Sequence, residues 1–264
     1  MNEFLGLAKE AATEAGTMLL HGIDRIGWIE HKGEINLVTE MDMKSEHLIK
    51  ERILSRYPHH QILAEESDAT TERSGYLWII DPLDGTTNYA HGFPIFCVSI
   101  ALQVEGIMQV GAVYDPTRNE LFTAVRGSGA HLNGKRISVS QTSDLDNALI
   151  ATGFPYDLRT SEVNNTDHWN AMLLRAQAIR RAGSAALDLC YTAAGRFDGF
   201  WELKLHPWDV AAGALMVEEA GGKVTHFGGE PFNVYSREIL ASNGKIHSQM
   251  ADILQKGKRP TITD

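Results

Sequence analysis

An apolar run that ends in two aspartates constrains this chain more than any other feature of its sequence. Residues 77–80 (Leu-Trp-Ile-Ile) predict a buried strand, and Asp81 and Asp84 follow on either side of Pro82 and Leu83. Pro82 fixes its own φ and favours a sharp turn, so both carboxylates can face one point in space. Carboxylate oxygens are hard ligands of the kind that Mg²⁺ prefers. The segment therefore predicts a Mg²⁺ site where the strand ends.

The residues that follow the second aspartate favour phosphate binding. Gly85, Thr86, Thr87 and Asn88 offer backbone N–H groups and hydroxyls at a turn or at the start of a helix. Backbone N–H groups that point out of such a turn commonly hold a phosphate in proteins. A metal site and a phosphate site side by side indicate phosphoryl chemistry.

The length and composition are those of a globular protein with a sizeable core. The chain has 264 residues, of which 43% are hydrophobic and 22% are charged. These fractions are ordinary for a folded domain, and no linker, repeat or low-complexity block interrupts them. We expect a single domain over residues 1–264. Its N-terminal half, about 1–145, carries the aspartate motif, and its C-terminal half, about 146–264, carries further acids that include Asp209.

The net charge and the two cysteines narrow the class of protein. A net charge of -10 opposes non-specific nucleic-acid binding, which needs a surplus of Lys and Arg. Cys97 and Cys190 lie in apolar surroundings and are expected to be reduced core residues. The N-terminus lacks the pattern of a secretory signal, and no segment approaches the roughly 20 apolar residues of a membrane span. These features predict a cytoplasmic protein with no membrane partner.

Hydrophobic periodicity predicts an alternation of helices and strands. The expected helices cover residues 4–20, 42–57, 167–177, 184–194 and 207–221. The expected strands cover residues 62–64, 97–104, 108–114, 148–152 and 199–202. Asp42 is the expected N-cap of the second helix. Glu105-Gly106 and Asn133-Gly134 predict tight turns between strands.

Four further acids stand at the end of an apolar strand or near the start of a helix, as Asp81 and Asp84 do. They are Asp42, Glu65, Glu202 and Asp209. Taken singly, each has an ordinary explanation, because acids are favoured near helix N-termini and are common at solvated strand ends. Taken together with the aspartate motif, they indicate one acidic site.

The motifs together resemble those of the inositol monophosphatase family of Mg²⁺-dependent phosphatases. W-I-I-D-P-L-D-G-T-T-N follows A-E-E-S, and W-D-V-A-A-G with E-A-G-G lies far downstream. V-T-E-M-D, N-Y-A-H-G-F-P and G-S-A-A-L-D-L extend the resemblance over nearly the whole chain. The resemblance implies an α/β fold, the layered αβαβα sandwich of the sugar phosphatases. It also implies a homodimer and inhibition by Li⁺.

The resemblance implies a site for two to three Mg²⁺ ions. The first ion would be bound by Glu65, Asp81 and the backbone carbonyl of Leu83, and the second by Asp81, Asp84 and Asp209. A third, weaker ion would lie near Glu65 and a mobile loop that carries Lys32. Carboxylates that converge in this way repel one another and raise each other's pKa until a metal ion neutralises them.

The resemblance also implies how the residues share the reaction. A metal-activated water would attack the phosphate ester in line, with Glu65 and the Thr86 hydroxyl orienting it and Asp42 holding that threonine. Backbone N–H groups of Gly85 and Thr86 would bind the phosphate. The residues expected to contact the rest of the substrate are Asp84, Ala185 through its N–H, Glu202 and Asp209.

Several functions remain open within this chemistry. The leading one is hydrolysis of inositol 1-phosphate to myo-inositol and phosphate. A fructose-1,6-bisphosphatase, alone or as a second activity, and a nucleotide 3′-phosphatase or NADP phosphatase are alternatives. A bisphosphate needs a cationic pocket, and Arg175, Arg180 and Arg181 are the obvious supply, although a solvated face or a subunit contact explains them as well. A different class of function is a regulatory binding partner with secondary catalysis.

Overall fold

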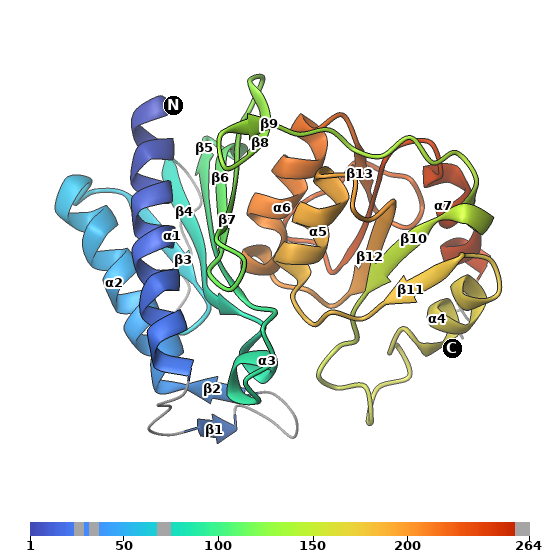
Figure 1. Ribbon diagram of the computed structural model, residues 1–264, viewed down its shortest axis with the longest axis horizontal. Helices are drawn as coiled ribbons and strands as arrows, with labels where there is room; N and C mark the ends of the chain where they lie inside the picture. The colour runs from blue at the N-terminus through green and yellow to red at the C-terminus, as the bar shows by residue number, and fades with distance from the viewer. Residues whose placement is uncertain (24–28, 32–36, 68–74, 257–264) are drawn as a thin grey trace, which may run out of the picture.

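The computed structural model describes residues 1–23, 29–31, 37–67 and 75–256. Helices and sheets alternate in five layers from one side of the molecule to the other (Figure 1). This arrangement is the αβαβα sandwich that the family resemblance implies. Among the described residues, no helix is both long and apolar enough to cross a membrane.

Two long helices form the first layer. They are α1 (Asn2–Gly22) and α2 (Glu40–Arg56), which lie side by side on the outer face of the larger sheet (Figure 1). The buried side of α1 is rich in alanine, with Ala8, Ala11 and Ala15 fully buried. Small side chains let the helix approach the strands closely, and larger residues such as Leu19 and Ile49 fill the remaining space.

The larger sheet has seven strands in the order β3-β4-β5-β6-β7-β8-β9. Their bounds are β3 (Gln61–Ala64), β4 (Tyr76–Asp84), β5 (Cys97–Val104), β6 (Ile107–Asp115), β7 (Glu120–Val125), β8 (Gly129–Leu132) and β9 (Lys135–Arg136). β3 and β4 pair in parallel, and the other neighbours are antiparallel. A separate two-stranded ribbon, β1 (Ile29–His31) and β2 (Leu37–Thr39), precedes α2.

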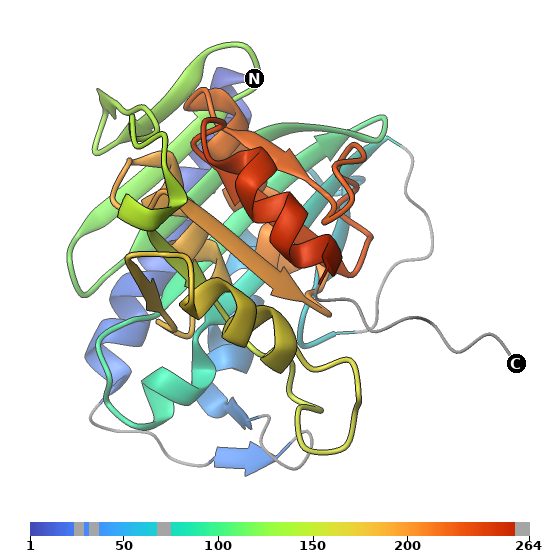
Figure 2. The ribbon, with the colours of Figure 1, turned by 90° about the vertical axis from the view of Figure 1, so that its right-hand side faces the viewer.

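The second sheet has five strands in the order β11-β10-β12-β14-β13. Their bounds are β10 (Leu149–Thr152), β11 (Ala178–Arg180), β12 (Gly199–Leu203), β13 (Lys223–Thr225) and β14 (Glu238–Ser242). Two helices, α5 (Ala185–Ala193) and α6 (Pro207–Glu219), fill the layer between the sheets and are apolar on nearly every side. The outer helices α4 (Thr166–Leu173) and α7 (His247–Lys256) cover the other face (Figure 2).

Most of the expected elements are confirmed, as are the two tight turns. Glu105, Gly106, Asn133 and Gly134 all have positive φ, as a two-residue hairpin loop requires. Both cysteines are buried and reduced. The expected helix over residues 167–177 is too long, because α4 ends at Leu173 and the chain then enters a strand, β11, that the sequence pattern did not indicate.

Two predicted details at the aspartate motif and at Asp42 are wrong. The strand does not end before Asp81, because β4 continues to Asp84. Asp81 pairs with Ser99 and Asp84 with Cys97, so β4 accommodates one extra residue in a bulge. Asp42 is not the N-cap of α2 either. The N-cap is Thr39, and Asp42 closes a capping box by accepting a hydrogen bond from the Thr39 N–H at 2.8 Å.

Candidate active site

The corner between β4 and the short helix α3 (Thr86–Ala90) organises the site. Gly85 is the residue at this corner and has φ of +93°. A Cβ at this position would lie 2.9 Å from the carbonyl oxygen of Ile95 and 3.3 Å from that of Gly183. Only glycine satisfies both the backbone angle and this close approach. The corner thus places Asp84 and Thr86 next to each other on the same side of the sheet.

Thr86 is held from two directions at the start of α3. Its hydroxyl lies 3.0 Å from Asp42 Oδ1 and 3.0 Å from the carbonyl oxygen of Leu83, and it donates to these acceptors. The other carboxylate oxygen of Asp42 accepts from Thr39, so Asp42 is fully buried and connects the N-terminus of α2 to α3. Asp42 therefore lies behind Thr86 and fixes its side chain.

An acidic cavity of about 210 Å³ opens at this corner. Its lining contains Glu65, Asp81, Leu83, Asp84, Gly85, Thr86, Tyr156, His206, Trp208 and Asp209. Asp209 arrives from the first turn of α6, where its carboxylate accepts a hydrogen bond of 2.7 Å from the His206 N–H. Every residue that the family resemblance assigns to the first two metal ions thus lines one cavity, although Glu65 and Asp209 are separated by more than half of the chain.

The charges in this cavity destabilise one another. Burial and repulsion from Glu65 and Asp84 raise the pKa of Asp81 well above its usual value, and the same causes raise the pKa of Asp209. A divalent cation would relieve this repulsion, and carboxylate oxygens suit Mg²⁺. In the described part of the chain, no three acidic, histidine or cysteine side chains stand close enough to form a finished metal site. Carboxylates that repel one another are expected to close up only around a cation.

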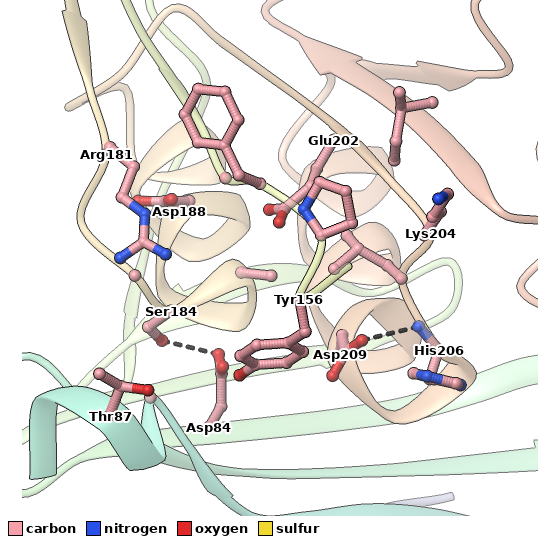
Figure 3. Close-up of a pocket in the computed structure, with 18 residues that line it drawn as sticks. Asp84, Thr87, Tyr156, Arg181, Ser184, Asp188, Glu202, Lys204, His206 and Asp209 are labelled. Carbon is pink, nitrogen blue, oxygen red and sulfur yellow. Dashed lines mark hydrogen bonds between the residues drawn. The ribbon is translucent and has the colours of Figure 1, made fainter. Parts of the chain in front are cut away.

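A second cavity of about 110 Å³ adjoins the first and lies between the larger sheet and the second sheet (Figure 3). The residues that line both cavities are Asp84, Gly85, Tyr156, His206 and Asp209. The additional lining includes Gly153, Arg181, Ser184, Ala185, Asp188, Glu202 and Lys204. The two cavities are therefore parts of one site with a shared wall.

Asp84 is the central residue of that wall. Its carboxylate accepts hydrogen bonds from the Ser184 hydroxyl at 2.7 Å and from the Ala186 N–H at 2.8 Å, at the N-terminus of α5 (Figure 3). Burial raises the pKa of Asp84 to about 6, although the hydrogen bonds from Ser184 and Ala186 oppose this rise. The side chain is thus anchored to the C-terminal half while its backbone belongs to β4.

Glu202 lies deeper in the second cavity, on β12. Burial and repulsion from Asp84 raise the pKa of Glu202 to about 8, and the nearby Arg181 guanidinium opposes the rise. The carboxylate packs so tightly over Gly153 that a Cβ there would lie 2.1 Å from Glu202 Oε1. Glu202, a candidate site residue in the sequence, thus lies in the wall of this cavity, and its contact with Gly153 follows only from the fold.

The other predicted residues are distributed as follows. Ala185 lines the second cavity, whereas Lys32 lies outside the described residues. The three arginines do not act as one group. Arg181 faces the second cavity, Arg175 lies 3.5 Å from Asp146 on an exposed surface, and Arg180 is exposed on β11.

Sequence reasoning missed three further residues of the lining, namely Tyr156, Asp188 and Lys204. Burial and the nearby carboxylates, Glu65 first among them, raise the pKa of Tyr156. The only sequence signal for Tyr156 is its place four residues after β10, in Gly153-Phe154-Pro155-Tyr156. Asp188 lies within the G-S-A-A-L-D-L segment that contributes to the family resemblance, and no separate sequence signal marks it as a site residue.

The layered fold and the acidic cavity at the end of a sheet strand are those of a class of phosphatases. The model of the inositol monophosphatase family matches residues 1–259, and the chain belongs to this family. It is 44% identical to the inositol-1-monophosphatase of Synechocystis sp. over 96% of this chain and 89% of that protein. It is 42% identical to the Nus factor SuhB of Pseudomonas aeruginosa over 99% of both chains.

Solved structures agree with this assignment. An inositol monophosphatase from Anabaena superposes with a TM-score of 0.89 at 45% identity and covers 97% of this chain and 96% of that one. An IMPase from Thermotoga maritima superposes with a TM-score of 0.89 at 36% identity, with coverage of 97% and 98%. The chain is therefore a phosphatase of a family whose members generally depend on metal ions.

Proposed function

We propose that this protein is a Mg²⁺-dependent phosphomonoesterase that hydrolyses inositol 1-phosphate to myo-inositol and phosphate. One observation carries the proposal, namely that Asp84 lines both the acidic cavity and the second, polar cavity. A phosphate in the first cavity would therefore have its esterified alcohol in the second. The relative from Synechocystis sp. named inositol-1-monophosphatase supports this choice of alcohol.

The metal-binding role falls to the lining of the acidic cavity. Glu65, Asp81 and the Leu83 carbonyl would hold one Mg²⁺, and Asp84 and Asp209 would join Asp81 around a second. The raised pKa values of Asp81 and Asp209 support this assignment, because such groups gain most from a neutralising cation. A third ion would lie near Glu65 and the loop of Lys32. When bound, Mg²⁺ supplies an acidified water and screens the charge of the phosphoryl oxygens.

The chain's own groups would orient the reaction. Glu65 and the Thr86 hydroxyl would position the attacking water, the Glu65 carboxylate would accept its proton, and Asp42 would keep that hydroxyl in place. The N–H groups of Gly85 and Thr86 would bind the phosphate where α3 begins. The place of Gly85 and Thr86 in the lining of the acidic cavity supports this, because a turn with positive φ at the start of a helix commonly offers N–H groups to an anion.

Recognition of the alcohol would belong to the second cavity. The Ala185 N–H can donate to a ring hydroxyl, and Asp84 and Glu202 can accept from others. Asp209 lies at the boundary and would contact the bridging part of the substrate. Both halves of the chain contribute to each cavity, which supports treating residues 1–264 as one catalytic unit.

The test is phosphate release from four esters, each with Mg²⁺ and with EDTA. The esters are inositol 1-phosphate, fructose 1,6-bisphosphate, adenosine 3′,5′-bisphosphate and NADP⁺. We expect release that requires Mg²⁺ and the highest kcat/KM for inositol 1-phosphate. Equal phosphate release in EDTA would contradict the role of the metal. A higher kcat/KM for one of the other three esters would make that ester the substrate in place of inositol 1-phosphate.

A regulatory binding role beside catalysis has one specific support. A relative that is 42% identical over nearly the full length carries the name Nus factor SuhB, and the same name recurs among other relatives. Any such role in this chain would use a protein partner, since the net charge of -10 disfavours direct nucleic-acid binding.

We also propose that the protein is a cytoplasmic homodimer and that Li⁺ inhibits it. Light scattering of the purified protein tests the dimer, and phosphate release with added LiCl tests the inhibition.

A further inference from the structure

Asp188 is a buried acid that lines the second cavity but whose hydrogen bonding is incomplete. It lies in the first turn of α5 and is only 1% exposed. Its Oδ1 atom is shielded from solvent and has no hydrogen-bond partner in the described structure. Buried carboxyl oxygens are nearly always paired in folded proteins, so an unpaired one that borders a cavity needs an explanation.

Other buried acids of this chain show what a structural role looks like. Asp198 accepts hydrogen bonds from the Ser140 hydroxyl and the Leu149 N–H, and Asp115 accepts from Thr117 and Arg118. Each of these two buried acids thus accepts at least two hydrogen bonds. Asp188 differs from them because it lines a cavity and its Oδ1 atom has no hydrogen-bond partner in the described structure.

The neighbours of Asp188 identify the kind of group that would fit. Glu202 and Asp84 raise the pKa of Asp188 in addition to the effect of burial, and Arg181 opposes them. Figure 3 shows Asp188 on the same side of the cavity as Arg181 and Glu202. The other cation of the lining, Lys204, is already engaged by Asp157 at 2.6 Å. An anionic group next to these carboxyls would be repelled, whereas a neutral hydroxyl would be accepted.

A hydroxyl also fits because of its double hydrogen-bonding capacity. It donates to a carboxylate and accepts from a carboxylic acid, so it can pair with Asp188 in either protonation state. Two buried carboxyl side chains on one wall, Asp188 and Glu202, can pair with two hydroxyls of the same ring. This arrangement suits a polyhydroxylated ring and gives no comparable contact to a simple alcohol.

We propose that Asp188 contacts the substrate and determines specificity, with its carboxyl group paired to a ring hydroxyl next to the one bound by Glu202. The inference rests on the proposed function, because it assumes that the alcohol of the ester occupies the second cavity. It adds the side chain of Asp188 to the contacts proposed for Glu202 on β12 and for the Ala185 N–H. A site that hydrogen-bonds a substrate hydroxyl rejects analogues that lack it, because the buried polar group is then unpaired.

The experiment compares two esters in Asp188 variants. The first is inositol 1-phosphate, and the second is p-nitrophenyl phosphate, which has no hydroxyl to recognise. In Asp188→Ala we expect the ratio of their kcat/KM values to fall by about 10- to 100-fold through a higher KM for the inositol ester. Asp188→Asn, which keeps an acceptor oxygen, should restore most of the ratio. Asp188→Leu, which leaves no empty space, replaces the alanine variant if that variant does not fold.

The matched control is Thr192→Val, one turn further along α5. Thr192 is fully buried and does not line the cavity, although its hydroxyl donates to the backbone carbonyl of Asp188. This variant perturbs the helix without touching the substrate, so the ratio of the two esters should stay at the wild-type value. A fall in the ratio equal to that of Asp188→Ala would assign the effect to the helix and overturn the inference.

Two further outcomes separate this inference from the function on which it rests. Wild-type protein that releases no phosphate from inositol 1-phosphate would refute the proposed function itself. If the wild type is active, two results with Asp188→Ala would refute only the role of Asp188. One is an unchanged ratio of the two kcat/KM values, and the other is a parallel loss of both activities. A series of monodeoxy inositol phosphates adds a direct check. The wild type should hydrolyse one of these analogues more slowly than inositol 1-phosphate, and Asp188→Ala should cause no further loss with that analogue.

Discussion

At the scale of single residues, the site depends on side chains that serve two structures at once. Asp84 has its backbone in β4, and its carboxylate accepts hydrogen bonds from Ser184 and Ala186 at the start of α5. Glu202 is buried on β12 and lies against the backbone of Gly153. Such contacts fix the carboxyl groups where a substrate can use them, and they make the neighbouring glycines sensitive to substitution.

Gly153→Ala should weaken substrate binding selectively. The new Cβ would lie 2.1 Å from Glu202 Oε1, so the buried Glu202 carboxylate must move. We expect KM for inositol 1-phosphate to rise by about 10-fold while kcat changes by less than about threefold. Steady-state kinetics measure both, and Gly6→Ala in α1, where a Cβ meets nothing within 4 Å, is the control. An unchanged KM in Gly153→Ala would argue against Glu202 as a substrate contact.

At the scale of elements, four helix starts converge on the site. They belong to α2, α3, α5 and α6, and Asp42 and Asp209 close capping boxes at the starts of α2 and α6. Capping stabilises a helix, but here it also orients groups that face the cavity. Asp42 uses one oxygen for the cap of α2 and the other for the hydroxyl of Thr86.

Replacing Asp42 should therefore affect both stability and turnover. Asp42→Ala removes the capping-box hydrogen bonds to Thr39 and the partner of Thr86, so the free energy of unfolding should fall by about 1–2 kcal/mol and kcat should fall as well. Thr39→Val is the informative comparison, because it weakens the same cap and leaves the contact from Asp42 to Thr86. Urea denaturation and kcat together test this. A kcat that falls equally in both variants would mean that stability alone explains the loss.

The start of α7 gives the stability a defined pH dependence. His247 is buried between the Ser242 and Thr225 hydroxyls, at 2.8 Å from each. Burial, with a smaller effect of Lys223, lowers the pKa of His247 to about 4. Because the unfolded chain protonates this histidine near pH 6.5, folding is favoured above that pH and is weakened progressively as the pH falls toward 4.

Denaturation measured between pH 7 and pH 5 tests the role of His247. His247→Gln should lower the free energy of unfolding at pH 7 but should flatten its decline with falling pH. His47→Gln, at an exposed position on α2, should retain the wild-type decline. A wild-type slope in His247→Gln would show that other groups cause the acid sensitivity.

The sequence predicts the elements of this site better than it predicts their junctions. The aspartate motif, the strand before it and the helix from Pro207 are recognisable because hydrophobic periodicity and turn residues are local signals. The bulge in β4 and the cap at Thr39 depend on pairing with β5 and on the path of the chain before α2. Arg181 and Asp188 join the site only because the residue after β11 and the first turn of α5 line the same cavity as Asp84, and no local pattern contains that information.

At the scale of the whole molecule, the site lies where the two halves of the chain meet. The N-terminal half supplies Glu65, Asp81 and Asp84, and the C-terminal half supplies Glu202 and Asp209. The concentration of buried carboxyls at this junction costs stability, because they are desolvated and repel one another. A cation that binds between them would stabilise the folded protein as a whole.

Mg²⁺ should therefore raise the melting temperature of the protein after treatment with EDTA. A concentration well above the dissociation constant should raise Tm by about 5 °C or more. Asp81→Asn should be at least as stable as the wild type in EDTA, since it removes one repelling charge, but Mg²⁺ should then raise its Tm much less. Differential scanning calorimetry measures both. A full Tm increase in Asp81→Asn would remove Asp81 from the metal ligands.

The most direct test of the account is phosphate release from inositol 1-phosphate by Asp84→Asn at saturating Mg²⁺. Asparagine keeps an oxygen for Ser184 and Ala186, so circular dichroism and Tm should show an intact fold. We predict that kcat falls by about 1000-fold or more, because a ligand and a substrate contact are altered in one substitution. A folded Asp84→Asn with kcat near that of the wild type would contradict the assignment of this site.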